Sequence, residues 1–330
     1  MIGPAADGAL MSAWQHAVTL LTGALLPVIA LVALGLAVRR GGMVSEAGVD
    51  DLNRLVYWIA LPAQLFLVIS RCSLVHDVPG RGLLTTLSGY AIGLLLAWWA
   101  TARLAPAARG SVVSGVARPN AAFIGLPVIQ LVAGTLPAAE AQPLLTAYHV
   151  LLGIMVACFN IGAVAAFLLP HQGITGSGLR RTLHELPRNP LILASVGGLV
   201  ASLIRPGLLS GTMVEPALSL VADLAIPLAL LLTGMQLDLA RLRQDPTILV
   251  LGALGKLVVV PAVTWAIGLA LGLDHGVLVA AVVMMACPVA MASTPMARML
   301  GGDPELMAAS IVASTICAPV TLMAWLFVLL

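Results

Sequence analysis

Charged residues are scarce in this chain: they make up 9% of its 330 residues, whereas soluble domains carry about a quarter. Hydrophobic residues make up 60%, and charge-free runs long enough to cross about 30 Å of hydrocarbon recur from one end of the sequence to the other. This composition excludes an ordinary soluble protein. It predicts an all-α integral membrane protein with many spans and no separate soluble domain.

The sequence also lacks the patterns of several other classes of protein. Four cysteines lie at irregular spacing in or beside apolar runs, which favours core residues over disulfides or metal ligands (Cys72, Cys158, Cys287 and Cys317). A formal net charge of +2 without a basic tail argues against nucleic acid as a partner. The N-terminus has neither basic residues nor a small-residue cleavage site, so we expect no signal peptide.

Motifs for catalysis and cofactor binding are missing as well. No H-E-x-x-H, G-x-S-x-G or G-x-x-x-x-G-K-[ST] pattern occurs. The only adjacent acidic pair, Asp50 and Asp51, lies in an arginine-bearing loop, where a solvated turn explains it. We therefore expect no cofactor, no metal ion and no enzymatic activity, with an intramembrane transferase as the rival enzyme class.

Ten apolar spans can be placed along the chain. They cover residues 16–38, 53–71, 82–103, 110–135, 143–169, 189–205, 214–237, 247–272, 275–299 and 306–330. The sixth has the shortest apolar run, from Leu191 to Ile204, and would extend by tilting or by including Asn189 and Pro190. Removing it would invert every later loop, so ten is the better count.

Basic residues are distributed unevenly between the two sides of this layout. If the N-terminus is outside, eleven of the 16 fall in cytoplasmic loops (Arg39, Arg40, Arg54, Arg103, Arg109, Arg180, Arg181, Arg188, Arg241, Arg243 and Arg298). Three fall on the opposite side, namely Arg71, Arg81 and Arg205, and Arg118 and Lys256 lie inside spans. The positive-inside rule therefore favours both termini outside.

The second half of the chain repeats landmarks of the first. A glycine-rich loop at 170–188, which we interpret as a cytoplasmic linker, separates five spans from five. Prolines recur across it at separations of 165 to 169 residues (Pro62 with Pro227, Pro119 with Pro288, and Pro127 with Pro295). Near-constant separations indicate an internal duplication, and copies with an odd number of spans must have opposite orientations. The sequence thus predicts an inverted repeat.

The fourth and ninth spans are interrupted by prolines among small polar residues. Proline removes a backbone donor and clashes with the preceding turn, so both spans should kink or unwind. Hydrocarbon cannot satisfy the freed backbone groups, so such helices must be packed in protein or line a wet cavity. Matched broken helices in the two halves of a membrane protein indicate a transporter's binding site.

Five segments resemble the auxin efflux carrier family, which includes plant PIN-type auxin exporters and bacterial malonate or malate permeases. They are LNRLVYWIALPAQLF, NAAFIGLPV, NPLILASVGGLVASL, LAIPLALLLTGMQLDL and MLGGDPELMAASI, in matching order over nearly the whole chain. The resemblance implies the bile-acid sodium symporter fold: two inverted five-helix repeats, here 1–169 and 189–330, with both termini outside. It also implies the plasma (inner) membrane of a bacterium.

The same resemblance implies a division of labour between the spans. A scaffold domain would hold spans 1, 2, 6 and 7, through which two copies would pair as a homodimer. A core or transport domain would hold spans 3–5 and 8–10. Spans 4 and 9 would cross at their prolines.

Asn120 is the strongest candidate for a substrate contact. Its carboxamide has two donors and two acceptor lone pairs, enough to hold a carboxylate or to satisfy unwound backbone. In the resembling family the asparagine before this G-[LI]-P turn lies near the substrate; in the ninth span, Ser293 and Thr294 replace an asparagine that many relatives carry. The predicted substrate site comprises the residues around the four prolines (Arg118, Asn120, Gly125, Pro127, Pro288, Ser293, Thr294 and Pro295).

Three ionisable residues inside the predicted spans each have two possible interpretations. Arg118 either presents its planar fork to a carboxylate or snorkels to the interface. Lys256 needs a counter-charge, and Asp223 is the obvious acid; the pair would be a static bridge or a proton relay. His149 is either a hydrogen-bonded core residue or a proton site. Tyr148 lies beside His149, and Asn160 has the same two interpretations as His149. Asn53, Gln64 and Gln236 are weaker candidates for facing the substrate cavity.

These features favour a secondary transporter that moves a small organic anion by alternating access. The resemblance suggests malonate, malate or an aromatic carboxylate such as indole acetate. Spans 4 and 9 lack acidic ligands for sodium, so proton coupling or uniport ranks above sodium symport. A sensor or a channel with the same fold is a third alternative.

Overall fold

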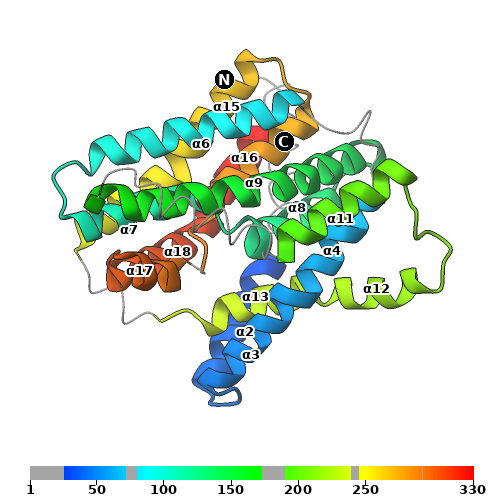
Figure 1. Ribbon diagram of the computed structural model, residues 1–330, viewed down its shortest axis with the longest axis horizontal. Coiled ribbons are helices and arrows are strands. Elements are labelled where there is room, and N and C mark those ends of the chain that lie inside the picture. Colours follow the sequence, from blue (N-terminus) through cyan, green and yellow to red (C-terminus); the bar gives the residue numbers. More distant parts are fainter. Residues whose placement is uncertain (1–25, 72–79, 173–189, 239–244, 292) are drawn as a thin grey trace, which may run out of the picture.

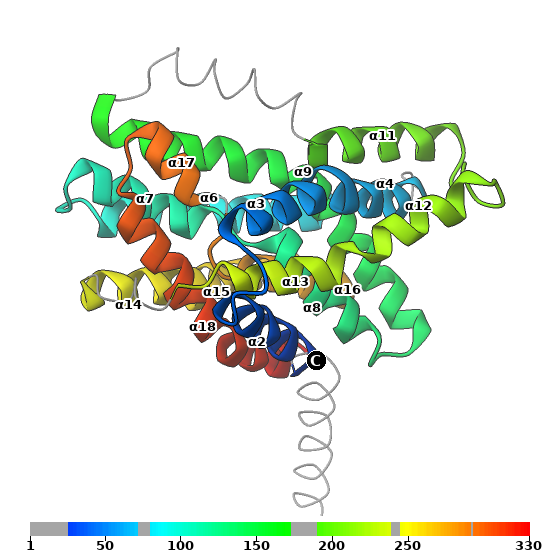
Figure 2. The same cartoon turned by 90° about the horizontal axis from the view of Figure 1, so that it is seen from below.

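The computed structural model describes residues 26–71, 80–172, 190–238, 245–291 and 293–330, and almost all of this part is helical (Figures 1 and 2). It contains no β-strand, only one isolated bridge. Six of its helical segments are long and apolar enough to cross a membrane (Glu46–Arg71, Gly80–Ala100, Ala138–His171, Val214–Met235, Pro246–Ala270 and Pro304–Leu329). The predicted all-α membrane protein is confirmed at this level.

Helices occupy each predicted span. In the first half they are α2 (Leu26–Arg40), α3 (Glu46–Leu55), η2 (Val56–Ala60), α4 (Leu61–Arg71), α6 (Gly80–Ala100), α7 (Pro106–Ala117), η3 (Ala121–Gly125), α8 (Leu126–Ala133) and α9 (Ala138–Gln172). In the second half they are α11 (Pro190–Ile204), α12 (Val214–Asp223), α13 (Ala225–Met235), α14 (Pro246–Leu254), η6 (Gly255–Val259), α15 (Val260–Ala270), α16 (His275–Ala286), α17 (Ser293–Leu300) and α18 (Pro304–Leu329).

Part of the prediction falls outside the described residues. The beginning of the first span, at 16–25, is not described, nor is most of the predicted linker, at 173–189. Cys72 and five arginines of the charge count also lie outside the described residues (Arg180, Arg181, Arg188, Arg241 and Arg243).

Among the described residues, three π-helical turns interrupt the spans, and each ends two residues before a proline. The prolines are Pro62 after η2, Pro127 after η3 and Pro261 after η6. Proline cannot donate to the carbonyl four residues earlier and its ring crowds that carbonyl, so the preceding turn widens. At η6 the freed carbonyl of Leu257 accepts a hydrogen bond from the indole of Trp325 (2.9 Å).

Contacts between helices fall mainly into two groups. In one, α4 packs against α11 and α12, and α2 packs against α13. In the other, α7 and α16 pack against α9, and α15 packs against α6 and α16. Figure 1 shows α4, α11 and α12 together on one side of the molecule and α6, α7, α17 and α18 on the other.

Glycine allows α2 and α13 to touch backbone to backbone. A Cβ atom at Gly35 would collide with the Leu231 carbonyl, and one at Gly234 would collide with the Val32 carbonyl. Small residues at such positions let membrane helices approach closely without a hydrophobic driving force. This contact joins helices from the two halves of the chain.

Candidate functional site

The fourth and ninth predicted spans are both interrupted, each at its first proline. Helix α7 ends at Ala117, and Arg118 takes an extended conformation (φ −119°, ψ 90°). Helix α16 ends at Ala286, and Cys287 is extended as well (φ −61°, ψ 147°). The second prolines interrupt nothing, contrary to the prediction. Pro127 lies two residues after the π-helical turn η3, which continues into α8 without a break. Pro295 lies in the first turn of α17, where backbone N–H groups have no intrahelical partner.

The two interruptions cross and pair through their backbones. Pro119 and Val289 form an antiparallel bridge. Asn120 donates its backbone N–H to the Pro288 carbonyl (2.7 Å), and Ala290 donates to the Arg118 carbonyl (2.9 Å). Backbone groups at the two interruptions thus find partners in the other half of the chain.

Residues on the far side of η3 hold it against this crossing. Tyr148 of α9 donates its hydroxyl to the Ala121 carbonyl (2.9 Å). A Cβ atom at Gly125 would collide with that hydroxyl and approach the Cys287 sulfur to 2.6 Å. Gly125 is thus required for close packing of α9, η3 and the second interruption, and it does not face the cavity described next.

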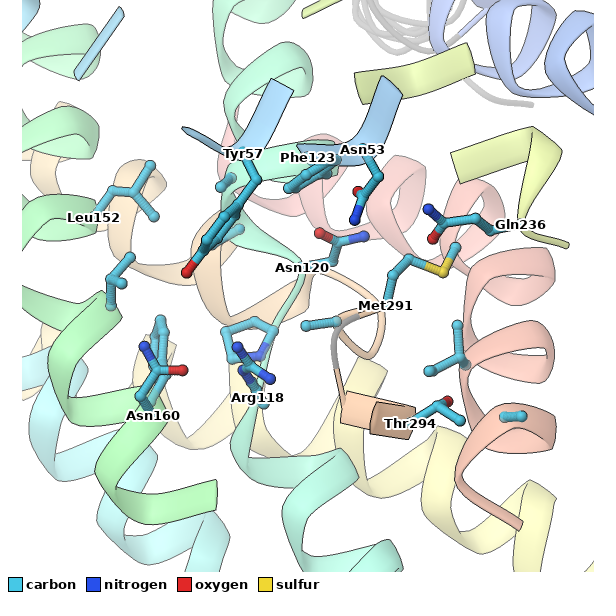
Figure 3. A pocket seen from close by; sticks show the side chains of 18 of the residues that line it. Asn53, Tyr57, Arg118, Asn120, Phe123, Leu152, Asn160, Gln236, Met291 and Thr294 are labelled. Atoms are coloured by element: carbon cyan, nitrogen blue, oxygen red, sulfur yellow. The ribbon is translucent and has the colours of Figure 1, made fainter. Parts of the chain in front are cut away.

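A cavity of about 410 Å³ opens beside the crossing (Figure 3). Its polar lining comes from α3, η2, α9, α17, the C-terminal end of α13 and the first interruption (Asp50, Asn53, Tyr57, Arg118, Asn120, Asn160, Gln236 and Thr294). Its apolar lining includes aromatic, aliphatic and thioether side chains (Phe123, Leu152, Val156, Phe159, Met291, Ile311 and Val312). A few polar groups among apolar walls are typical of a small-molecule site.

Arg118 is the one basic side chain among the described residues that line the cavity. Its guanidinium donates to the Met296 sulfur of α17 (2.7 Å), a weak acceptor. No acidic side chain in the described part of the chain forms an ion pair with it. A half-buried guanidinium with only a thioether partner retains donors for a carboxylate.

Asn120 stands next to Arg118 at the same crossing. The residue is 3% exposed, and its side-chain Nδ2 is buried without a hydrogen-bond partner. Buried amide groups are normally satisfied, so an unpaired one at a cavity wall is a donor for a ligand or for water. Figure 3 shows Asn53 on the other side of this amide from Arg118.

The structure brings together only some of the predicted site residues. Arg118, Asn120 and Thr294 line the cavity. The weaker candidates Asn53, Asn160 and Gln236 line it as well. The remaining predicted residues with described side chains lie behind the wall (Gly125, Pro127, Pro288 and Ser293). Pro288 contributes its carbonyl to Asn120, and Ser293 is fully buried. The side chain of Pro295 lies outside the described part.

The three other ionisable candidates lie away from the cavity. Lys256 and Asp223 do not form the expected ion pair: the Lys256 ammonium donates to the Met285 carbonyl (2.7 Å), whereas Asp223 is exposed at the end of α12. His149 is 2% exposed, and its Nδ1 contacts the Leu145 carbonyl of its own helix (2.6 Å). The core reading of His149 fits this geometry.

Sequence reasoning missed Tyr57, Phe123 and Met291. Asp50, Asn53 and Tyr57 follow one another at intervals of three and four residues, so they share a helix face. That spacing was visible in the sequence and could have indicated a polar face toward the cavity. The described part of the chain contains no group of three potential metal-binding side chains.

Comparison with known proteins identifies the chain's family. A family described as membrane transport protein matches residues 20–173 and 174–326, and the boundary falls within the predicted linker. An uncharacterized transporter of Methanothermobacter thermautotrophicus is 26% identical over 315 residues, covering 93% of this chain and 98% of the relative. These matches confirm the resemblance to the auxin efflux carriers, and the chain belongs to this family of integral membrane transport proteins.

Proposed function

We propose that this transporter carries a small organic anion, which binds in the cavity at the crossing of the two interruptions. One observation carries the proposal: Arg118 faces the cavity with a sulfur atom as its partner and without an acid. A cation is costly at membrane depth and is retained there for function. A substrate carboxylate would supply the missing counter-charge, with the Asn120 amide as a further donor.

The charges around the cavity favour a substrate with one carboxylate. Arg118 is the basic residue of the described lining and Asp50 the acidic one, so a second carboxylate would lack a cation. The apolar lining around Phe123, Phe159 and Met291 suits an apolar or aromatic body. Among the anions that the family resemblance suggests, an aromatic monocarboxylate therefore fits better than malonate or malate.

We propose the full architecture as ten spans in two inverted five-helix repeats. The packing of α2, α4, α11, α12 and α13 supports a scaffold built from spans 1, 2, 6 and 7. The packing of α6, α7, α9, α15 and α16 supports a core domain. Movement of the core past the scaffold would expose the cavity to each side of the membrane in turn.

Three further features of the proposal follow the sequence. Both termini lie outside, in agreement with the arginine distribution, and the membrane is the plasma (inner) membrane of a bacterium. Two copies pair through their scaffolds. Transport is proton-coupled or a uniport, because the described polar lining offers amides and one carboxylate rather than an oxygen cage for sodium.

The test is uptake into proteoliposomes that contain the full-length protein. Labelled indole-3-acetate, benzoate, malonate and malate would be compared with and without a pH gradient. We expect saturable uptake of the two monocarboxylates and uptake of malonate and malate at least about tenfold lower, because an unpaired carboxylate in the cavity is strongly penalised. Uptake of none of the four, or of the dicarboxylates alone, would contradict the proposal.

A further inference from the structure

Lys256 is a buried cation that the proposed binding site does not use. It is the only lysine of the chain, and its side chain is 0% exposed within η6. No described acidic side chain forms an ion pair with it. Burial of an unpaired ammonium is costly, so its position demands a specific partner.

The partner of Lys256 is the end of the interrupted helix α16. The last four carbonyls of a helix have no intrahelical donor, and in α16 these belong to residues 283–286. Lys256 donates to the Met285 carbonyl (2.7 Å), and the Cys287 thiol donates to the Val283 carbonyl (3.2 Å). An ammonium at the C-terminal end of a helix also opposes the negative pole of its dipole.

The chain that follows α16 cannot provide these donors itself. Pro288 has no N–H group. The N–H of Val289 donates to the Ser314 hydroxyl (3.1 Å), and the N–H of Ala290 is used in the crossing, at the Arg118 carbonyl. A donor from another element is therefore needed, and η6 packs directly against α16.

The π-helical turn places Lys256 where it is needed. Because Pro261 removes a hydrogen bond from this span, the Leu257 carbonyl is free to accept from Trp325 of α18 (2.9 Å). The turn that carries Lys256 is thereby tied to α18 on one side and to α16 on the other. π-helical turns within α-helices are frequent at functional positions.

We propose that Lys256 is a positioning residue of the crossing: its ammonium fixes the end of α16, and thereby the Pro288 carbonyl that orients Asn120. The Pro288 carbonyl, which accepts the Asn120 N–H (2.7 Å), lies three positions after the Met285 carbonyl in the chain. Lys256 does not touch the substrate in this role. It supports the wall of the cavity from behind.

Hydrogen exchange of the full-length protein tests the backbone part of this proposal. Lys256→Met keeps a long apolar side chain but removes the ammonium. We expect amide exchange of Asn120 and Ala290 to accelerate about tenfold to a hundredfold, because a hydrogen bond from a charged group is lost at a buried carbonyl. Exchange in the middle of α6, which has no bond to Lys256, should stay as in the wild type.

Two further variants separate the charge from the fold. Lys256→Gln keeps an N–H donor without the charge and should give intermediate exchange at the crossing. Thr264→Val is the matched control, because Thr264 is also 0% exposed in the same predicted span but its hydroxyl bonds its own helix, at the Val260 carbonyl. Unchanged exchange at Asn120 in Lys256→Met would overturn the proposal. A rise of equal size in α6 would also overturn it, since Lys256 would then support the whole fold.

A binding measurement connects the crossing to the site and rests on the proposed function. The Kd of indole-3-acetate should rise about tenfold in Lys256→Met and by a smaller factor in Lys256→Gln. It should not change in Thr264→Val. An unchanged Kd beside accelerated exchange would overturn the link between Lys256 and the site. If the wild type binds no indole-3-acetate, the substrate proposal fails, and the exchange result still decides the role of Lys256.

Discussion

The two interruptions at the centre of the molecule have similar backbones and different side chains. Both leave their helix just before a proline, and each donates one N–H to a carbonyl of the other. The first carries Arg118 and Asn120, whose polar groups face the cavity. The second presents Met291 to the cavity, and Thr294 follows at the start of α17. Lys256 donates to a carbonyl at the end of the helix that precedes this interruption. Two interruptions with the same backbone pairing therefore differ in their chemistry. In the function that we propose, the first binds the substrate and the second supports the crossing.

The largest effect is expected at the charged end of the first interruption. Arg118→Met should weaken binding of indole-3-acetate by about 2 to 5 kcal/mol, because the substrate carboxylate would be left without a buried cation. Equilibrium binding to the purified protein measures this loss. Arg54→Ala is the control, because Arg54 is 77% exposed and pairs only loosely with Asp51 (3.7 Å). If Arg118→Met and Arg54→Ala bind indole-3-acetate with equal affinity, Arg118 is not part of the binding site.

A pair of neutral substitutions compares the two interruptions directly. Asn120→Ala should weaken binding by about 1.5 to 3 kcal/mol, because its unpaired buried amide donates to a charged group of the substrate. Thr294→Val, on the other side of the cavity, should change the Kd less than about threefold. The same titration measures both variants. A larger loss in Thr294→Val than in Asn120→Ala would reverse the roles that we assign to the two interruptions.

A further substitution tests the packing between the two interruptions. Gly125→Ala should lower the stability of the detergent-solubilised protein by about 1 to 3 kcal/mol, because the new methyl group overlaps the Tyr148 hydroxyl and crowds Cys287. Thermal unfolding measures the difference. Gly115→Ala is the matched control on α7, where the nearest atom to the new methyl, a Val289 methyl, is 3.7 Å away. Equal melting temperatures for the two variants would contradict this account.

The smallest effect is expected at the support of η3. Tyr148→Phe removes the hydroxyl that donates to the Ala121 carbonyl and should cost about 1 kcal/mol of stability. The affinity for indole-3-acetate should stay within about threefold of the wild type, since Tyr148 does not line the cavity. Thermal unfolding and the binding titration measure the two quantities. A loss of affinity as large as that of Asn120→Ala would place Tyr148 in the site.

The sequence predicted where the apolar helices lie and where two of them break. Apolar runs have to match the thickness of the bilayer, and Pro119 and Pro288 cannot continue a helix, so both features are local. Pro127 misled the prediction because the widened turn η3 accommodates it without a break. A local rule identifies a proline, but neighbouring packing decides how the helix responds to it.

The candidate site was predictable only in part, because it depends on which face each helix turns to the cavity. Arg118 and Asn120 could be identified, since polar residues beside a break have few other uses. Lys256 and Asp223 were paired from their charges alone, yet Lys256 binds a backbone carbonyl. The turn that directs it there is set by Pro261 and Trp325, which lie five and 69 positions away from it.

The backbone pairing of the crossing also has a consequence for the evolution of the protein. Its two hydrogen bonds join main-chain atoms of Arg118, Asn120, Pro288 and Ala290. Side chains at 118, 120 and 290 can therefore be exchanged without removing the bonds that keep the crossing together. A lineage could alter its cargo through point mutations at these few positions while the rest of the molecule stays as it is.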